Sequence, residues 1–196
     1  MTPIVILAAG SSSRMGTPKQ NLYIGRHTLL QQMVQAAIAA SDKVLVILGA
    51  NFHAIEATIN DTNAGILYNK DWALGMSSSI KLAVSHIQLK HTNTDAIVFM
   101  VCDQPYVNAE LLKELIITAC KVKEEIIACS YNGIMGVPVV FKKSYFPELL
   151  TLNGKEGAKK ILEQHMEDVY TIPFLLGSVD IDTEEDYNNL PTGLDL

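Results

Sequence analysis

Several features that mark other classes of protein are scarce or missing in this sequence. Acidic residues outnumber basic ones, 21 to 15, and the formal net charge of -6 argues against a general binder of nucleic acid or membrane surfaces. The longest apolar runs, such as residues 96–102, fall far short of the roughly 20 residues that span a membrane. The opening residues lack the positively charged start of a signal peptide. We therefore expect a cytoplasmic protein with neither nucleic-acid nor membrane partners.

Cysteine and histidine are too few or too scattered to indicate a disulfide scaffold or a zinc site. The three cysteines form no C-x-x-C pair, and an odd number gives no disulfide framework. Cys102 and Cys129 lie within apolar runs, which predicts small core residues. The histidines show none of the spacings of zinc ligands, so we expect ordinary polar roles for them.

A glycine-rich turn follows the first apolar run of the chain. Residues 4–7 are apolar and rich in β-branched side chains, which predicts a buried strand. Gly10 ends this run, and Arg14, Gly16 and Lys19 follow within a few residues. Glycine lets the backbone approach an anion closely, and the two cations supply charge, so the turn suits a phosphate. The spacing matches neither a Walker A loop nor a G-x-G-x-x-G fingerprint, and a plain turn remains the alternative reading.

Strands and helices alternate through the first half of the sequence, which predicts an α/β fold. We expect one domain, residues 1–196, with a mostly parallel sheet, helices on both faces and antiparallel additions in the second half. Thr28 and Asn108 are predicted helix caps, and Pro138 predicts an edge or irregular strand. The expected strands are residues 4–7, 44–48, 66–68, 96–102, 126–129, 137–141, 169–172 and 179–181. The expected helices are residues 28–40, 52–59, 77–88, 108–120, 143–150, 156–163 and 183–189.

Asp103 stands just past the strongest predicted strand, in the position that Gly10 has after the first one. Ligands of open α/β sheets bind beyond the carboxyl ends of the strands, where the strand order reverses. In the common order 3-2-1-4 the first and fourth strands are neighbours, and Gly10 and Asp103 would line one crevice. A carboxylate repels a phosphate, so the pair predicts a cation between them. Magnesium, which favours one or two carboxylates plus phosphate oxygens, is the expected ion.

Motifs spread over nearly the whole chain resemble, in order and spacing, those of the MobA-like nucleotidyltransferases. They are Leu7-Ala8-Ala9-Gly10 with Ser13, Arg14, Met15-Gly16 and Lys19; Trp72 with Gly75-Met76-Ser77; Cys102-Asp103-Gln104-Pro105; Gly136-Val137-Pro138 with Phe141; Gly154 with Gly157-Ala158; and the segment from Asp180 to Tyr187. Within that family the chain is most similar to the molybdenum cofactor cytidylyltransferases. The resemblance implies a three-layer, Rossmann-like nucleotidyltransferase fold.

The resemblance also implies an activity, which is Mg²⁺-dependent transfer of CMP from CTP to molybdopterin cofactor. The products would be molybdopterin cytosine dinucleotide and pyrophosphate. Ala9 stands where guanylyl relatives usually have a second glycine, which favours CTP. The sequence leaves open the use of GTP or another phosphorylated acceptor, and a non-catalytic nucleotide-binding maturation factor. A recipient molybdoenzyme is a further candidate partner.

Roles for single residues follow from the same resemblance. Arg14 and Lys19 would hold the triphosphate, and Asp103, with Asp182 as a second candidate, would bind the metal. Asp182 has an alternative role as a helix cap. Trp72 is more often a core residue than a lid. The expected substrate-binding residues are Leu7, Ala8, Ala9, Gly10, Ser11, Gly75, Met76 and Ser77 for the nucleotide, and Gly136 and Pro138 for the acceptor.

Overall fold

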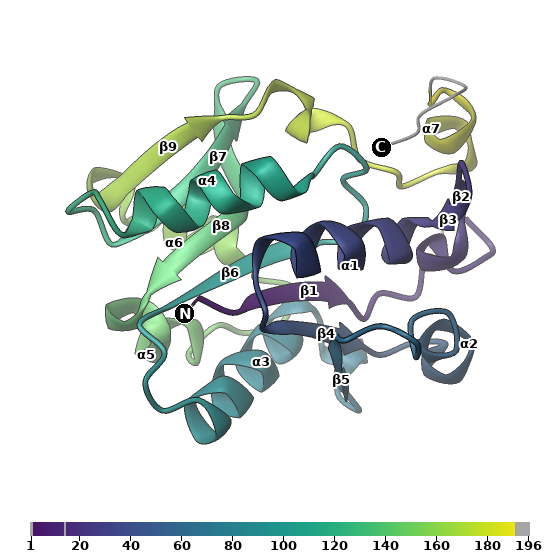
Figure 1. The fold of residues 1–196 in the computed structure, drawn as a ribbon, viewed down its shortest axis with the longest axis horizontal. Helices are drawn as coiled ribbons and strands as arrows, with labels where there is room; N and C mark the ends of the chain where they lie inside the picture. The colour runs from purple at the N-terminus through teal and green to yellow at the C-terminus, as the bar shows by residue number, and fades with distance from the viewer. Residues whose placement is uncertain (1, 14, 191–196) are drawn as a thin grey trace.

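A seven-stranded mixed sheet forms the middle layer of the protein (Figure 1). The computed structural model describes residues 2–13 and 15–190. The first four strands across the sheet run parallel, β8 is antiparallel to both of its neighbours, and β9 is parallel to β7. The order is β5 (Gly65–Tyr68), β4 (Val44–Leu48), β1 (Ile4–Ala8), β6 (Ala96–Val101), β8 (Ile134–Lys142), β7 (Ile126–Tyr131) and β9 (Val169–Pro173).

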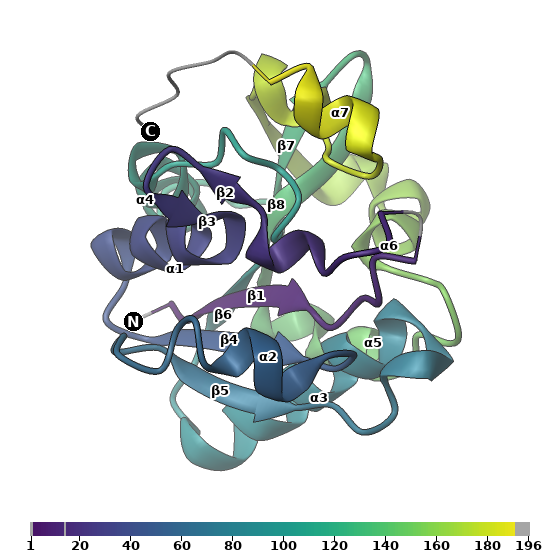
Figure 2. The same ribbon diagram turned by 90° about the vertical axis from the view of Figure 1, so that its right-hand side faces the viewer.

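Helices cover both faces of this sheet, as predicted (Figures 1 and 2). The strand β1 shows how the sequence builds the layers, because alternate residues of a strand point to opposite faces. Ile4 and Ile6 belong to one core cluster, and Val5 and Leu7 to the other. The first cluster packs against α1 (Leu29–Ala40), α2 (Phe52–Glu56) and α4 (Ala109–Ala119), and the second against α3 (Met76–Lys90), α5 (Phe146–Leu149) and α6 (Ala158–Gln164). None of the helices in the described part of the chain is both long and apolar enough to span a membrane.

The two predicted helix caps are confirmed. The Thr28 hydroxyl accepts a hydrogen bond from the backbone N–H of Gln31 at the start of α1, and the Gln31 side chain accepts one from the backbone N–H of Thr28. Asn108 accepts from the backbone N–H of Leu111 at the start of α4. These bonds satisfy N–H groups that have no partner within a helix. The burial of Cys102 and Cys129 is also as expected.

The predicted strand at residues 179–181 is wrong. The chain instead forms the 3-10 helix η5 (Leu175–Ser178) and then runs irregularly to α7 (Glu184–Asn188). The buried side chain of Ile181 packs in a small cluster with Ile24 and Leu29, away from the sheet, so its backbone joins no ladder. The cap of α7 is Thr183, which forms a capping box with Asp186, and the cap role considered for Asp182 is therefore also wrong.

Two hairpins differ from the expected pattern. Asn132 and Gly133, with φ of 49° and 74°, make a tight turn directly between β7 and β8, so both strands extend into the predicted connection. Pro138 lies in an interior strand, where the register of β7 against β8 shifts between Ala128 and Cys129 and leaves the proline outside the ladder. The edge-strand alternative is therefore wrong and the irregular one is correct. The short hairpin β2 (Tyr23–Ile24) and β3 (His27–Thr28) was not predicted.

The remaining short elements are 3-10 helices, and some predicted helices are shorter than expected. The helix predicted at residues 52–59 stops at Glu56, and the one predicted at 143–150 divides into η3 (Lys143–Tyr145) and α5. The other 3-10 helices are η1 (Lys19–Asn21), η2 (Trp72–Leu74) and η4 (Met166–Asp168).

Candidate active site

The carboxyl ends of β1 and β6 lie side by side in the sheet. Leu7 pairs with Val101, so the turn after β1 and the segment after β6 leave the same edge of the sheet. Gly10 stands in the first segment and Asp103 in the second. This is the edge at which open α/β sheets bind their ligands.

Lys19 connects three segments that are far apart in the sequence. Its Nζ lies 2.6 Å from Asp103 Oδ2, 3.0 Å from Asp182 Oδ1 and 3.4 Å from the Ile181 carbonyl oxygen. Burial acts to lower the pKa of Lys19, but the charge and hydrogen bond of Asp103, helped by Asp182, outweigh it and raise the pKa above its ordinary value. The Lys19 side chain is therefore a fixed ammonium between two carboxylates.

Gln20 holds the glycine-rich turn in place, although nothing in the sequence distinguished it. The residue is 0% exposed, and its Nε2 donates to the carbonyl oxygens of Ala8 at 2.9 Å and Gly10 at 3.1 Å. Its Oε1 accepts from the Ser12 hydroxyl at 3.3 Å, and Ser12 Oγ accepts from the Lys19 backbone N–H at 3.0 Å. The turn and the lysine are thus fixed by one buried hydrogen-bond network.

A cavity of about 250 Å³, here called the glycine-turn cavity, opens beside this network. Its lining includes Leu7, Ala9, Gly10, Ser11, Gly75 and Met76, all of which were predicted substrate-binding residues, together with Trp72, Ala73 and Ser79. Ala8 lies elsewhere, because its side chain faces the core cluster of α1. Ser77 also lies outside this lining, and its hydroxyl donates to the Gly154 carbonyl oxygen at 2.8 Å.

Trp72 packs against the core cluster of α3, as expected of a core residue, and it also forms one wall of the glycine-turn cavity. The wall stands close to the sheet because residue 49 is a glycine. A Cβ atom at Gly49 would lie 2.5 Å from Trp72 Cβ and 2.7 Å from the Ala9 carbonyl oxygen. Any larger residue at position 49 would push Trp72 out of the cavity wall.

The predicted acceptor-side residues lie on another part of the sheet. Gly136 and Pro138 are in β8, and the ring of Tyr131 covers Gly136 so closely that a Cβ there would overlap it. Gln104, which is 1% exposed, donates to the Gly177 carbonyl oxygen at 2.7 Å and lies 3.4 Å from the Tyr131 hydroxyl. The residue after Asp103 therefore connects the site to the segment with Gly136.

Negative charge dominates the described side chains around Lys19. Partial burial and the charges of Asp103 and Asp182 raise the pKa of Asp180 to about 6, so three carboxylates face one ammonium. Among residues 2–13 and 15–190 no three His, Cys, Asp or Glu side chains converge closely enough to hold a metal ion alone. Asp103 and Asp182 nevertheless fit Mg²⁺, which takes one or two carboxylates and completes its shell with water and phosphate oxygens. Arg14 lies outside the described residues.

Cys102 precedes Asp103 but offers no nucleophile. Burial, joined by the charge of Asp103, raises the pKa of its thiol to about 12, and the side chain is enclosed in the core. A thiol attacks as its thiolate, which is almost absent at neutral pH with such a pKa. The site is thus built to bind charge and not to form a covalent intermediate on sulfur.

The model of the MobA-like NTP transferase domain matches residues 4–169. The chain belongs to this family. The molybdenum cofactor cytidylyltransferase of Escherichia coli (strain K12) is 26% identical over 187 residues, which cover 93% of this chain and 92% of that protein. The family match indicates that this MobA-like protein is a nucleotidyltransferase.

Solved structures agree with this assignment. The crystal structure of the Mycobacterium tuberculosis Rv0371c homologue from Mycobacterium sp. strain JC1 is 31% identical, with a TM-score of 0.84 over 96% of this chain and 94% of that one. Rv0371c from Mycobacterium tuberculosis H37Rv in complex with manganese is 28% identical, with a TM-score of 0.81 over 96% of this chain and 97% of that one. This MobA-like chain therefore shares its whole fold with these proteins.

Proposed function

We propose that this MobA-like protein is a Mg²⁺-dependent cytidylyltransferase that transfers CMP from CTP to molybdopterin cofactor. The products are molybdopterin cytosine dinucleotide and pyrophosphate. The observation that carries the proposal is the Lys19 ammonium, held between Asp103 and Asp182 next to the glycine-turn cavity. The likeness to the Escherichia coli cytidylyltransferase over 93% of the chain supports the choice of nucleotide and acceptor.

The reaction needs no nucleophile from the protein. A phosphate oxygen of the acceptor attacks the α-phosphorus of CTP, the bond from that phosphorus to the oxygen bridging to the β-phosphorus breaks, and pyrophosphate leaves with that oxygen. Negative charge gathers on the α-phosphate oxygens and on the leaving group. Groups that are already oriented toward this charge stabilise it without reorganising. Lys19 has that role here, with the backbone of Gly10 and Ser11 in the cavity wall.

The charge around Lys19 supports the proposed need for a bound cation. The three carboxylates Asp103, Asp180 and Asp182 would repel a triphosphate if the ammonium were the only positive group beside them. Asp103 and Asp182 would hold Mg²⁺, which neutralises triphosphate oxygens when it is bound. The turn that begins at Gly10 then presents the triphosphate to that charge, because Gln20 holds it in place.

Pyrophosphate release tests the proposal. The purified protein is incubated with CTP or GTP, with and without Mg²⁺ and with and without molybdopterin cofactor. We expect release only with CTP, Mg²⁺ and the cofactor together. Release with GTP but not with CTP would show that the proposed nucleotide is wrong. Release with CTP in the absence of Mg²⁺ would show that the proposed metal requirement is wrong.

Asp103→Asn separates the role of this carboxylate from its place in the fold. We expect a loss of turnover on the order of 100-fold or more, because the substitution removes a charge that is needed to hold the cation. Asp95→Asn is the matched control, since Asp95 is an exposed residue just before the opposite end of β6. Turnover of Asp103→Asn within threefold of this control would remove Asp103 from the site.

A further inference from the structure

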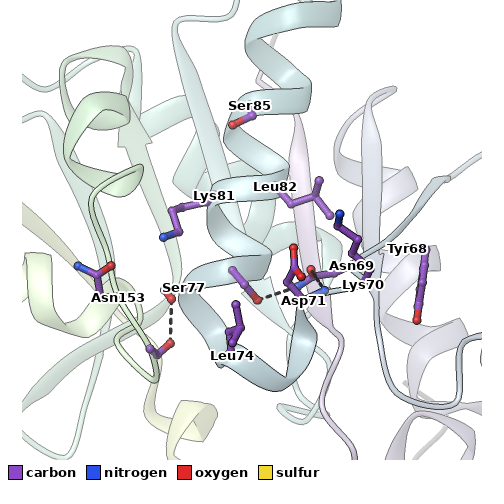
Figure 3. Close-up of a pocket in the computed structure, with 12 residues that line it drawn as sticks. Tyr68, Asn69, Lys70, Asp71, Leu74, Ser77, Lys81, Leu82, Ser85 and Asn153 are labelled. Atoms are coloured by element: carbon purple, nitrogen blue, oxygen red, sulfur yellow. Dashed lines mark hydrogen bonds between the residues drawn. The ribbon is translucent and has the colours of Figure 1, made fainter.

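A second and larger cavity lies along the outer side of α3. Its volume is about 640 Å³, and it is called here the α3 groove. The segment at the end of β5 forms one side, α3 the floor, and Asn153 with Gly154 the other side (Figure 3). Ligand cavities for small molecules have volumes of roughly 300–1,000 Å³. The α3 groove therefore has the size of a small-molecule site, and of the predicted substrate-binding residues only Ser77 lines it.

The α3 groove carries positive charge on a protein of net charge -6. Lys70 and Lys81 both line it, against the single carboxylate of Asp71. Neither lysine has an ion pair with any residue in the described part of the chain, whereas other lysines such as Lys142 and Lys160 do. In Figure 3 Lys81 extends from α3 toward Asn153, and Lys70 lies on the other side of the view, near the end of β5. Two cations are thus available to an anion that enters the groove.

The polar groups around these lysines indicate the class of anion. The Ser85 hydroxyl and the amide of Asn153 line the same space, and Asp71 can accept hydrogen bonds from hydroxyl groups. Ammonium groups bind phosphate through strong charge-assisted hydrogen bonds. The combination suits a small phosphate monoester that also carries hydroxyl groups.

Residues 72–76 form a wall between the α3 groove and the glycine-turn cavity. Leu74, which is 67% exposed, faces the groove, whereas Trp72, Ala73, Gly75 and Met76 line the glycine-turn cavity. Leu74 therefore belongs to the same short segment as four residues that line the glycine-turn cavity, and a ligand that shifts this segment changes the shape of that cavity.

A buried amide joins the two sides of this wall. Asn69, which is 3% exposed, donates from Nδ2 to Ser78 Oγ at 2.8 Å and to Ser79 Oγ at 2.9 Å. Ser78 lines the α3 groove, and Ser79 lines the glycine-turn cavity. Asn69 Oδ1 also accepts from the Asp71 backbone N–H at 3.0 Å, which fixes the start of the wall. The two cavities thus share one hydrogen-bonded frame.

We propose that the α3 groove is a second ligand site, which binds a small hydroxylated phosphate monoester and transmits its occupancy to the glycine-turn cavity through residues 72–76. The site is separate from the one that holds Lys19, Asp103 and Asp182. Its existence does not depend on which nucleotide or acceptor the protein uses.

Calorimetry and fluorescence with glycerol 3-phosphate test the proposal. The titrations contain no nucleotide, acceptor or Mg²⁺, at constant ionic strength, with glycerol as the blank ligand. We expect saturable heat with glycerol 3-phosphate and none with glycerol. Trp72 is the only tryptophan of the chain, so its emission reports directly on the wall, and we expect it to change along the same binding curve.

Matched variants locate the binding. Lys81→Gln should weaken it about tenfold, because one charge-assisted hydrogen bond is lost. Lys90→Gln, on the exposed last turn of α3 outside the groove, and Lys19→Gln should both bind within twofold of the unaltered protein. No saturable heat, or equal losses in Lys81→Gln and Lys90→Gln, would overturn the site, and a loss confined to Lys19→Gln would place the ester at the glycine turn instead. Binding without a change in Trp72 emission would overturn the coupling.

These outcomes are distinct from those of the activity test. A protein with no pyrophosphate release can still bind the ester in the α3 groove, and a protein that transfers CMP can fail to bind it. Each experiment therefore decides one proposal only.

Discussion

Replacing Gln20 by glutamate changes the hydrogen bonding at the centre of the site while keeping the shape of the side chain. The amide Nε2 of Gln20 donates to the carbonyl oxygens of Ala8 and Gly10, at 2.9 and 3.1 Å. In Gln20→Glu a carboxylate oxygen takes the position of that nitrogen and faces two oxygens with no proton between them. Because the side chain is 0% exposed, water cannot enter to separate the groups.

The size of the effect follows from these contacts. Two hydrogen bonds are lost, at about 1 kcal/mol each, and the buried Ala8 carbonyl and the introduced carboxylate add desolvation costs of about 1–3 kcal/mol or more. We expect the free energy of unfolding at pH 8 to fall by about 4 kcal/mol. Protonation restores one donor, so the pKa of the introduced carboxyl is raised in the folded state above its unfolded value of about 4.3.

This raised pKa fixes the sign of the pH dependence. The destabilisation is fully present above the folded-state pKa and decreases as the pH falls through that pKa toward the unfolded value. Urea denaturation at pH 8 and pH 5 measures it, with Gln88→Glu, on the exposed end of α3, as the control. If Gln20→Glu lowers the free energy of unfolding by less than about 1 kcal/mol at pH 8, or by the same amount at both pH values, the role given to Gln20 is refuted.

Three further predictions concern other parts of the site. Because Asp180 has a pKa of about 6, we expect the Mg²⁺ concentration for half-maximal pyrophosphate release to rise as the pH falls through that value, and Asp180→Asn to remove this step; a step that survives the substitution would assign it elsewhere. Gly75→Ala should lower the free energy of unfolding by about 2 kcal/mol or more, because φ is 106° and a Cβ would overlap the Gly154 carbonyl oxygen. Gly133→Ala is the control, because φ is 74° and no atom lies within 4 Å of the added carbon, and its free energy of unfolding in urea should fall by only about 1 kcal/mol. Equal losses in Gly75→Ala and Gly133→Ala would contradict the steric argument. Thr183→Ala should lower the free energy of unfolding by about 1 kcal/mol, because the cap of α7 is lost. Turnover measured at low temperature, where the variant stays folded, should be unchanged. A large loss of turnover would give Thr183 a direct role in the site.

The parts of the fold that local sequence determines were the parts that could be predicted. Buried strands such as β1 and β4 are unbroken apolar runs, and the caps at Thr28 and Asn108 act on residues only three positions away. The prediction of a strand at residues 179–181 failed because distant residues decide the local structure there. The apolar alternation of this segment resembles a strand, but Ile181 is held by Ile24 and Leu29, which lie more than a hundred residues earlier in the chain.

The same distinction applies to the candidate site. The glycine turn and Asp103 could be placed near each other because the first and fourth strands are neighbours in the common order 3-2-1-4, as β1 and β6 are here. The position of Asp182 beside Lys19 could not, since the sequence left Asp182 either as a metal ligand or as a helix cap, and the structure shows that Thr183 is the cap. Gln20 could not be predicted either, because glutamine is mostly a surface residue and its partners here are backbone carbonyls.

The contacts of Lys19 make the C-terminal segment part of the folding unit that contains the proposed nucleotide site. Residues 179–188 join no strand of the main sheet, and they are fastened through Lys19, through the Asp103 carbonyl that accepts from the Ile181 N–H, and through the Tyr187 hydroxyl on Tyr23. Ligands that bind only when these segments are packed together stabilise that packing by mass action. Saturating nucleotide should therefore slow amide exchange and protease cleavage in this segment, even though it lies at the far end of the chain from the turn.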